Sequence, residues 1–400
     1  MAVTQRLPLE GVKIVALSQF GAGPFATLNL ADMGAEVIKI EDPSTGGEVS
    51  RFVPPYRIEG DSLYFQSWNR NKRSITLNLR VSEGKEVFRD LIAIVDVVFN
   101  NLRGDQPRKL GITFEQLKEV NRRIVCCTLN AFGSKGPMSA DPGYDYLMQA
   151  YTGYMSITGD PSGPPAACGV SFIDHAAGFA AALGIVSALY SVQRTGVGRD
   201  VEVSLLDTAY SMLTYLGIWN LNRGFEPKRH PGSSHQTLVP VQTFRTQDGF
   251  IVIFCGKEKF WQELCAAFED TQMAEDKRFV SFESRFENRH AVIEAVQAHF
   301  LKKTTREWIE ILGGKVPCAP VRTLSEALSD ADLEKRGTVL TVEHPVFGPV
   351  RELNTPVRFS NVEKHHRRAP TLGEDTVTIL EDYLHYSDAQ VKRLRDAGAI

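Results

Sequence analysis

The stretch VKIVALSQFGAGPFATLNLADMGAEVIKIED, residues 12–42, carries the strongest architectural signal in the chain. Residues 12–18 and 35–42 are rich in Val and Ile, which predicts two strands, and the segment between them reads as a turn and a helix that ends at Gly34. Strands that alternate with helices form parallel sheets. The sequence therefore predicts an α/β fold from its first forty residues.

The same alternation continues downstream of this stretch. Further strands are expected at Ser74–Leu79, at Val95–Asn101 and within residues 122–133, and a helix is expected across residues 82–95. From about Leu221 the pattern changes to a polar, turn-rich linker at residues 223–236.

After this linker the sequence predicts an α+β segment of about 100 residues. It begins with a hairpin over residues 238–255 that turns at Gln247–Gly249, and helices follow at Lys259–Phe268, His290–Leu301 and Thr305–Leu312. Short strands at residues 337–344 and 348–354 precede a terminal helix, with Ser387 as its N-cap and Ala397 near its end. The chain is thus expected to hold two domains.

Composition narrows the class of protein. Lys and Arg number 45 against 48 Asp and Glu, a net charge of −3, which gives no overall basic field for nucleic acid. The six cysteines form no CxxC pair, and the nine histidines show no metal-binding spacing. The N-terminus lacks the apolar run of a signal peptide, and the apolar stretch Ala176–Tyr190 is too short for a membrane span. We expect a cytoplasmic enzyme or binder without a metal, a membrane or a nucleic-acid partner.

A glycine-rich turn follows the first strand. Residues 21–26, GAGPFA, fit the G-x-G-x-x-A pattern of nicotinamide-cofactor sites, and Glu41 ends the next strand, where a ribose-binding acid is expected. Pro24, however, lacks an N–H that a pyrophosphate would use. The alternative is a simple packing turn between a strand and a helix.

Clustered cations provide a second signal. Lys72 and Arg73 belong to the basic run Asn69–Arg73, while Arg103, Arg108 and Lys109 follow the fourth predicted strand. Loop cations at the carboxyl ends of parallel strands can bind phosphates. The alternative is a solvated, charged loop face.

Two carboxylates provide the third signal. Asp174 stands at the start of a long apolar helix, where it is either an ordinary N-cap or an ionised carboxylate used as a nucleophile. Asp145 is either a second acid near it or a turn residue. His175 is a weak candidate base for Asp174, because adjacent helix residues point to different faces.

Many ordered motifs together resemble the class III CoA-transferases, the CaiB/BaiF family that includes formyl-CoA transferase. The resemblance covers nearly the whole chain, and its motifs are LEGVKI (9–14), AGP (22–24), LADMGAEVIKIE (30–41), NRNKRSI (69–75), GYD (143–145), TGD (158–160), TGVGR (195–199), TQDG (246–249) and LGEDT (372–376).

The resemblance implies a fold and a chemistry. It implies a Rossmann-like CoA-binding domain with a parallel sheet, built from residues 1–220 and 326–400, a small α+β domain at residues 221–325, and an interlocked homodimer. Asp174 would be the nucleophile of an aspartyl anhydride and aspartyl-CoA mechanism, with Asp145 as a second acid. CoA and acyl-CoA would be substrates, with no permanently bound cofactor. Residues expected to contact CoA are Phe20, Gly21, Ala22, Lys72, Arg73, Asn101, Leu102, Arg103, Arg108, Lys109 and Tyr144.

The substrates are predicted less directly. The pattern is closest to family members that use dicarboxylates, with succinyl-CoA as a common donor, and a second carboxylate is expected to bind near His235, Gln236 and Arg245. The loop over the intermediate falls at Gly256, where this chain has a single glycine, so we expect a less mobile lid. The racemases of the family have His where Tyr144 stands, which favours transfer. A racemase or isomerase, a nicotinamide oxidoreductase and a non-catalytic CoA binder remain alternatives.

Overall fold

The computed structural model describes residues 6–362 and 366–400, and the chain divides into two compact units. The large unit comprises Met1–Thr152, Gly169–Thr214 and Asp332–Ile400, and the small unit comprises Gly153–Cys168 and Tyr215–Ala331. The large unit is therefore assembled from three separate stretches of the chain, including both of its ends.

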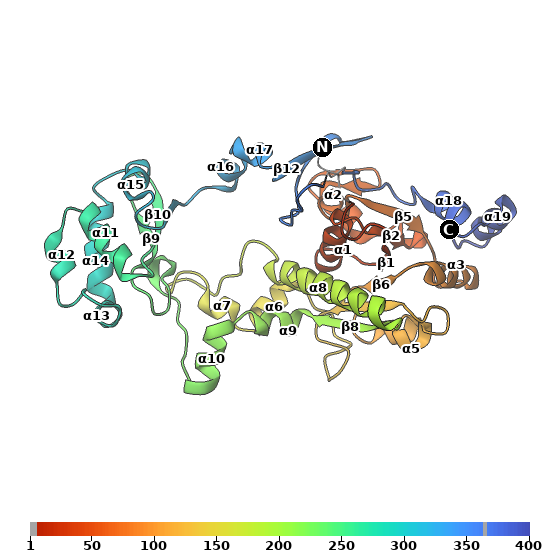
Figure 1. The fold of residues 1–400 in the computed structure, drawn as a ribbon, viewed down its shortest axis with the longest axis horizontal. Coiled ribbons are helices and arrows are strands. Elements are labelled where there is room, and N and C mark those ends of the chain that lie inside the picture. Colours follow the sequence, from red (N-terminus) through yellow and green to blue (C-terminus); the bar gives the residue numbers. More distant parts are fainter. Residues whose placement is uncertain (1–5, 363–365) are drawn as a thin grey trace. The chain divides into compact units, whose positions relative to one another are not determined.

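A six-stranded parallel sheet forms the centre of the large unit (Figure 1). Its strand order is β5-β2-β1-β6-β7-β8, with bounds β1 Lys13–Leu17, β2 Glu36–Glu41, β5 Lys72–Thr76, β6 Val97–Asn100, β7 Val125–Asn130 and β8 Arg199–Ser204. Counted along the chain this order is 3-2-1-4-5-6, the doubly wound arrangement, whose direction reverses between β1 and β6. The α/β prediction is confirmed.

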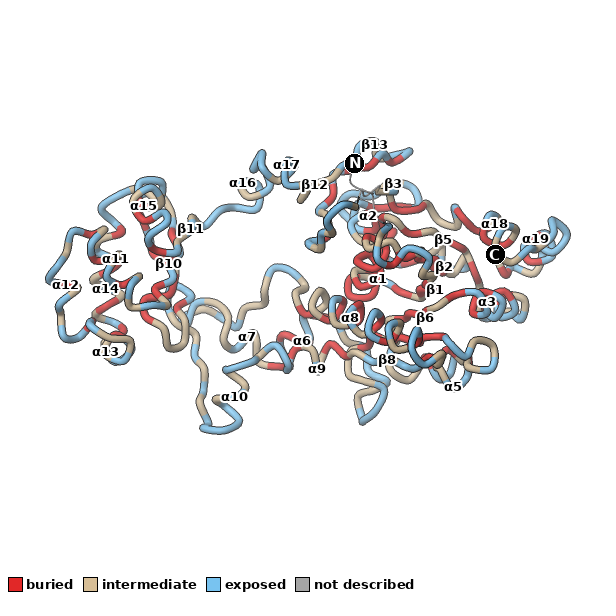
Figure 2. Tube along the Cα trace, in the orientation of Figure 1, coloured by how far each residue is buried: buried red, intermediate tan, exposed pale blue. Residues whose placement is uncertain are grey.

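Helices cover the sheet. Helix α8 (Phe172–Thr195) packs against α1 (Ala22–Asp32) and against β7 and β8. Helix α3 (Ser82–Ile94) and the C-terminal residues share a second apolar core with the strands, through Val87, Leu91, Ile379 and Leu394. Figure 2 shows that buried residues concentrate on the strands of this sheet and on α1.

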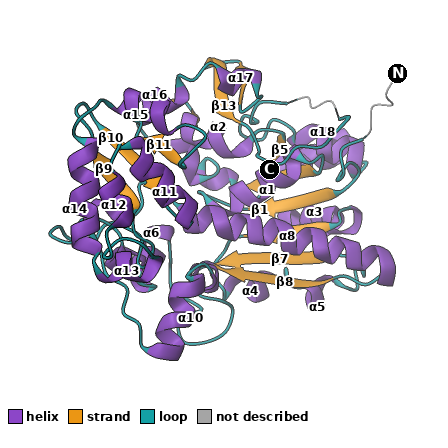
Figure 3. Cartoon of the chain, turned by 60° about the vertical axis from the view of Figure 1, so that its left-hand side comes forward, coloured by secondary structure: helices purple, strands orange, loops and turns teal. Residues whose placement is uncertain are grey.

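Helix α8 is longer than the sequence predicted. By length and composition it passes the test for a membrane-spanning helix, which corrects the expectation that its apolar stretch is too short. One such helix is weak evidence for a membrane span, and in this structure one face of α8 packs against α1, β7 and β8. Figure 3 shows α8 running alongside these strands.

The remaining elements of the large unit are short. They are η1 Pro43–Thr45, η2 Val49–Phe52, β3 Arg57–Ile58, β4 Asp61–Ser62, α2 Leu63–Asn69, α4 Gln106–Leu110, α5 Phe114–Leu117, α6 Asp145–Tyr151, α9 Leu205–Ser211, α17 Asp332–Lys335, β12 Val339–His344, β13 Gly348–Leu353, α18 Thr376–Thr378, η4 Ile379–Tyr383 and α19 Asp388–Asp396. The predicted N-cap Ser387 of the terminal helix is confirmed, and Ala397 is its C-cap.

The small unit has a three-stranded antiparallel sheet of order β11-β10-β9. The predicted hairpin is confirmed as β9 (Val241–Arg245) and β10 (Phe250–Phe254), whereas β11 (Cys318–Pro320) was not predicted. Its core includes Trp261, Phe300 and Trp308. The helices of this unit are α7 Tyr154–Ile157, α10 Thr214–Arg223, η3 Pro231–Ser233, α11 Glu258–Ala267, α12 Thr271–Glu275, α13 Phe282–Glu287, α14 Arg289–Phe300, α15 Thr305–Leu312 and α16 Leu324–Leu328.

Candidate active site

A cavity of about 430 Å³ opens at the carboxyl ends of β1 and β6, where the strand order reverses. This is the place where ligands bind in doubly wound sheets. The predicted site residues that line it are Phe20, Gly21, Ala22, Asn101, Leu102, Arg103, Tyr144 and Asp174. The fold thus brings together side chains that lie more than 150 residues apart in the sequence.

Asp174 stands in the first turn of α8 and faces the turn that follows β1. A Cβ atom placed on Gly21 would lie 2.9 Å from Oδ2 of Asp174. A larger residue at position 21 would therefore displace the carboxylate or be displaced by it. The glycine lets the backbone of this turn come within contact distance of the Asp174 carboxylate.

Asp145 caps the helix that carries Asp174. Its Oδ2 accepts hydrogen bonds from the backbone N–H groups of Ile173 (2.7 Å) and Asp174 (3.1 Å), and its side chain also accepts one from Gln149. Free N–H groups at a helix start are ordinarily satisfied by such a cap. The N-cap carboxylate is thus Asp145, which comes from α6, and Asp174 does not serve as its own cap.

The consequence is an unusual titration of Asp174. Burial, and then the negative charge of Asp145, raise the pKa of Asp174 to about 7. An ionised carboxylate was one of the two alternatives that the sequence left for Asp174, and the raised pKa means that this carboxylate keeps its proton to a higher pH than an ordinary one. The physical reasons are burial, which is the larger cause, and the like charge of Asp145.

His175 points away from this carboxylate. Its ring packs against Phe25 (centroids 4.8 Å apart) and Trp68 (5.4 Å), and burial lowers its pKa. It lines a separate cavity of about 530 Å³ between α1, α2 and β13, which none of the predicted site residues lines. This geometry agrees with the prediction from the sequence that His175 is a weak candidate for a base acting on Asp174.

The predicted phosphate-binding cations lie in two places. Arg103 lines the cavity, and Arg108 and Lys109 are exposed on the neighbouring helix α4, with Lys109 paired to Asp105 at 2.6 Å. These three remain candidates for a phosphate.

The other two cations belong to the start of β5, not to a carboxyl end. Lys72 is buried and donates to the Pro24 carbonyl (2.9 Å) and to Asn69 (3.0 Å), and Arg73 pairs with Glu36 (3.0 Å). The structure therefore contradicts the prediction for Lys72, which is buried inside the large unit, whereas the partly exposed Arg73 stays a candidate. The sequence signal failed because the basic run precedes its strand.

Asn101 was predicted to contact the CoA chain. In the structure its side chain accepts from the Gln19 N–H (2.9 Å) and donates to the Gln19 carbonyl (2.8 Å). A Cβ on Gly23 would lie 2.7 Å from the Asn101 side chain. Asn101 thus lines the cavity and also holds the turn after β1 in place.

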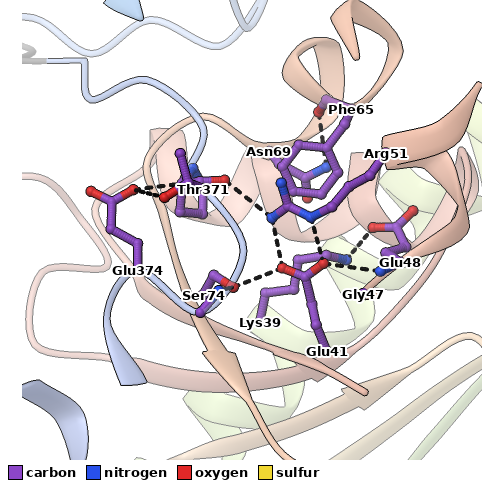
Figure 4. A network of polar contacts seen from close by, with 12 residues as sticks. Lys39, Glu41, Gly47, Glu48, Arg51, Phe65, Asn69, Ser74, Thr371 and Glu374 are labelled. Carbon is purple, nitrogen blue, oxygen red and sulfur yellow. Dashed lines mark hydrogen bonds and ion pairs between the residues drawn. The ribbon is translucent and has the colours of Figure 1, made fainter. Parts of the chain in front are cut away.

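Glu41 does not face a ribose site, which corrects the nicotinamide alternative. Its carboxylate is fully buried and accepts two hydrogen bonds from Arg51 (2.7 and 2.8 Å) and one from Ser74 (2.7 Å), as Figure 4 shows. Burial would raise the pKa of Glu41, but Arg51 and then Lys39 lower it to about 2. This carboxylate has no free oxygen for a ligand.

The predicted second-carboxylate residues all belong to the small unit. His235 accepts from the N–H groups of Thr237 (3.2 Å) and Leu238 (3.0 Å) and contacts the Tyr215 hydroxyl (3.1 Å), so its ring shapes a turn. The amide of Gln236 bonds the backbone of Lys228, whereas the side chain of Arg245 is exposed.

Gly256 follows β10, and a Cβ there would lie 2.2 Å from the ring of Phe254.

Within residues 6–362 and 366–400, no group of three or more His, Cys, Asp or Glu is placed to hold a metal ion.

Some residues near the site were not predicted. Burial and then the charge of Asp174 raise the pKa of Tyr64, which places this phenol near the carboxylate. Lys39 and Glu48 form a buried ion pair behind the β1 turn. A lysine inside the apolar strand VIKIE was the available signal, because an unpaired lysine is almost never fully buried.

Comparisons with known proteins place the chain in a family. A model described as CoA-transferase family III matches residues 9–376. Succinyl-CoA:glutarate CoA-transferase of Mus musculus is 33% identical over 98% of this chain and 90% of its own length, and succinate–glutarate CoA-transferase of Agrobacterium fabrum is 31% identical over 94% and 95%. A crystal structure of a CAIB/BAIF family protein from Brucella suis superposes with a TM-score of 0.81 at 33% identity, covering 94% of this chain and 100% of that one.

Proposed function

This chain belongs to CoA-transferase family III, and we propose that it moves CoA from an acyl-CoA donor to a carboxylic acid through a covalent intermediate on Asp174. The observation that carries the proposal is the contact between the Asp174 carboxylate and Gly21 in the cavity at the reversal point of the sheet. A thioester bound in that cavity would meet a carboxylate already positioned for attack.

In the proposed reaction an oxygen of Asp174 attacks the thioester carbonyl carbon. The C–S bond breaks, CoA leaves as a thiolate, and a mixed anhydride remains on Asp174. The thiolate then attacks the aspartyl carbonyl carbon, which releases the first acid and forms an aspartyl-CoA thioester. The acceptor carboxylate attacks the aspartyl carbonyl carbon of this thioester, which breaks its C–S bond, expels CoA thiolate and forms a second mixed anhydride. The thiolate then attacks the acceptor's acyl carbon in that anhydride, which gives the new acyl-CoA and regenerates the Asp174 carboxylate.

The environment of Asp174 supports this role. A carboxylate with a raised pKa is more basic than an ordinary one and, when ionised, a stronger nucleophile. Asp145 holds the backbone N–H of Asp174 itself, which fixes the position of the residue. The helix α1 begins next to Gly21, and the N–H groups of Ala22 and Gly23 are the proposed donors to the negative charge that develops on the attacked carbonyl oxygen.

We propose a dicarboxylyl-CoA, with succinyl-CoA first, as the donor. The support comes from the relatives, whose names include succinyl-CoA, succinate and glutarate. Arg103, Arg108 and Lys109 are the proposed contacts to the phosphates of CoA, and Arg245 and Gly256 stay candidates at the acid end. A panel of acyl-CoA donors crossed with acceptor acids tests the assignment: transfer from succinyl-CoA to a dicarboxylate supports it, and exchange limited to monocarboxylates contradicts it.

A racemase or isomerase of the same family is the second candidate. The observation that favours transfer is that Tyr144 lines the cavity at the position where the racemases of the family have His. Deuterium incorporation at the α-carbon of an acyl-CoA in heavy water separates the two functions. Binding of NAD(H) would support the alternative of a nicotinamide oxidoreductase. Absence of label exchange between acyl-CoA and free acid would support the alternative of a non-catalytic CoA-binding protein.

We also propose a homodimer in the cytoplasm. The support for association is the row of exposed apolar side chains on α8, which includes Phe179, Leu183 and Tyr190. The support for a reducing compartment is that all six cysteines are free thiols. Sedimentation equilibrium tests the first proposal, and a monomer at micromolar concentration would contradict it.

A further inference from the structure

The turn that touches Asp174, residues Ser18–Gly21, is held from behind by two buried charges. Lys39 comes from the middle of β2, and Glu48 comes from the segment that precedes η2. Their side chains are 0% and 3% exposed and form an ion pair with each other. Neither residue lines the cavity.

Glu48 acts on the backbone of Phe20. Its Oε1 accepts the Phe20 N–H at 2.8 Å and also the hydroxyl of Ser50. Phe20 has φ of +59°, a left-handed conformation that side chains other than glycine adopt at a cost. The hydrogen bond to Glu48 thus holds a backbone conformation that the turn would not favour by itself, one residue before Gly21.

Lys39 acts on the other side of the same turn. Its ammonium group donates to the Ser18 carbonyl at 2.6 Å and pairs with Glu48. The two side chains therefore hold a carbonyl and an N–H two residues apart. With Asn101 on Gln19, three successive residues of the turn are held by side chains from other segments of the chain.

The neighbouring pair Glu41–Arg51 fixes the position of Glu48. The Glu48 N–H donates to Oε2 of Glu41 at 3.0 Å, and this carboxylate is bound by Arg51 and Ser74. Figure 4 shows Lys39 and Glu48 beside Glu41 and Arg51 in one connected network. The Glu41 carboxylate of the first pair bonds the backbone of Glu48. The side chains of the second pair, Lys39 and Glu48, bond the backbone of the Ser18–Gly21 turn.

We propose that Lys39 and Glu48 are positioning residues for the transfer reaction, which fix the Ser18–Gly21 turn against Asp174. The inference rests on the proposed function of Asp174. A buried ion pair is often no more stabilising than an apolar pair of the same size, so stability alone gives little reason for these two charges. Their hydrogen bonds to opposite sides of one turn supply a reason.

Two matched double variants test the role. Lys39→Met/Glu48→Gln and Lys39→Met/Glu48→Leu both remove the ion pair, but only the first keeps an oxygen for the Phe20 N–H. Because a displacement of about 1 Å costs on the order of 100-fold in rate, we expect the Leu variant to have a kcat lower than the Gln variant by about 10- to 100-fold. The KM for acyl-CoA should stay within about threefold in both. Equal kcat values in the two variants would overturn the proposal.

Ser74→Ala is the structural control. It removes a buried hydroxyl from the same network, the donor to Glu41, without touching the turn. We expect a lower free energy of unfolding and an unchanged kcat. A kcat loss in Ser74→Ala as large as that of the Leu variant would mean that disturbing any part of the buried network lowers kcat. That result would overturn a specific role for Glu48.

The wild-type protein gives a test that does not depend on variants that fold. The Phe20 amide lies in a turn that lines an open cavity, yet it is bonded to a buried carboxylate. Its hydrogen exchange should be slowed by on the order of 100-fold or more relative to an unstructured peptide. Exchange at the unstructured rate would overturn the proposal. Failure of the proposed nucleophile would appear separately, as turnover in Asp174→Asn.

Discussion

Two buried carboxylates of the large unit, Asp174 and Glu41, have pKa values that are shifted in opposite directions. Burial raises the pKa of both. At Glu41 the cations Arg51 and Lys39 reverse this effect and bring the pKa to about 2, whereas at Asp174 the nearest charge is another carboxylate and the pKa rises to about 7. The partner of a buried carboxylate therefore decides whether it serves packing or chemistry.

The largest expected difference between the two regions is catalytic. Asp174→Asn removes the proposed nucleophile and should lower kcat by at least about 1,000-fold, with CoA binding retained. Steady-state transfer and CoA titration measure this. Asp141→Asn, an exposed carboxylate on the rim of the same cavity, is the matched control and should stay within about threefold of wild type. Full turnover in Asp174→Asn would move the nucleophile elsewhere.

The second largest difference is in stability. Arg51→Met leaves Glu41 buried without its main partner, and we expect the free energy of unfolding to fall by about 3–5 kcal/mol. Urea unfolding measures this loss. Adding Glu41→Leu to Arg51→Met should recover part of it, because the unpaired charge is gone, and a double variant that is less stable than Arg51→Met would contradict this account. The exposed Arg108→Met should change stability by less than about 0.5 kcal/mol.

The third prediction concerns the charge that Asp145 places next to Asp174. Asp145→Asn removes a cause of the raised pKa, so the ionised form of Asp174 should persist to lower pH. Relative to its own plateau, kcat/KM of the variant at pH 5 should exceed that of wild type by on the order of tenfold. The midpoint of the acid limb of kcat/KM measures the shift, and an unchanged midpoint would show that burial alone sets this pKa.

Local sequence patterns predicted the surroundings of Asp174 better than those of Glu41. The strands at residues 12–18 and 35–42 and the position of Asp174 followed from apolar runs and motif order. Strand β8 was missed because Arg199, Asp200 and Glu202 make an edge strand look like a loop. The raised pKa of Asp174 comes from burial and then from the charge of Asp145, which lies 29 residues away in sequence and bonds the Asp174 N–H, and no local pattern specifies either.

Lys72 shows the limit of reading charge from position. Its run looked like a phosphate site, but the strand begins at Lys72, which turns the side chain under α1 towards the Pro24 carbonyl. The buried pair Lys39–Glu48 was visible only as a lysine inside an apolar strand, and its partner became clear from the fold. The sequence thus predicted which segments belong to the candidate site, whereas the partners of the buried charges could be seen only in the tertiary contacts.

The last prediction concerns the pH dependence of stability. Because the folded-state pKa of Asp174 is about 7, above the ordinary value of 3.8, the folded protein holds this proton more tightly than the unfolded chain. The proton's stabilising contribution is complete below about pH 4 and is lost as pH rises through about 7. Asp174→Asn avoids this loss, so its stability relative to wild type should increase by about 3–4 kcal/mol between pH 4 and pH 8. Glu41 predicts the opposite dependence, since its lowered pKa gives stability that is present above pH 4.5 and lost as pH falls towards 2. Urea unfolding of wild type and Asp174→Asn between pH 4 and pH 8 measures the first slope, and urea unfolding of wild type between pH 2 and pH 4.5 measures the second. A pH-independent difference between Asp174→Asn and wild type would contradict the raised pKa.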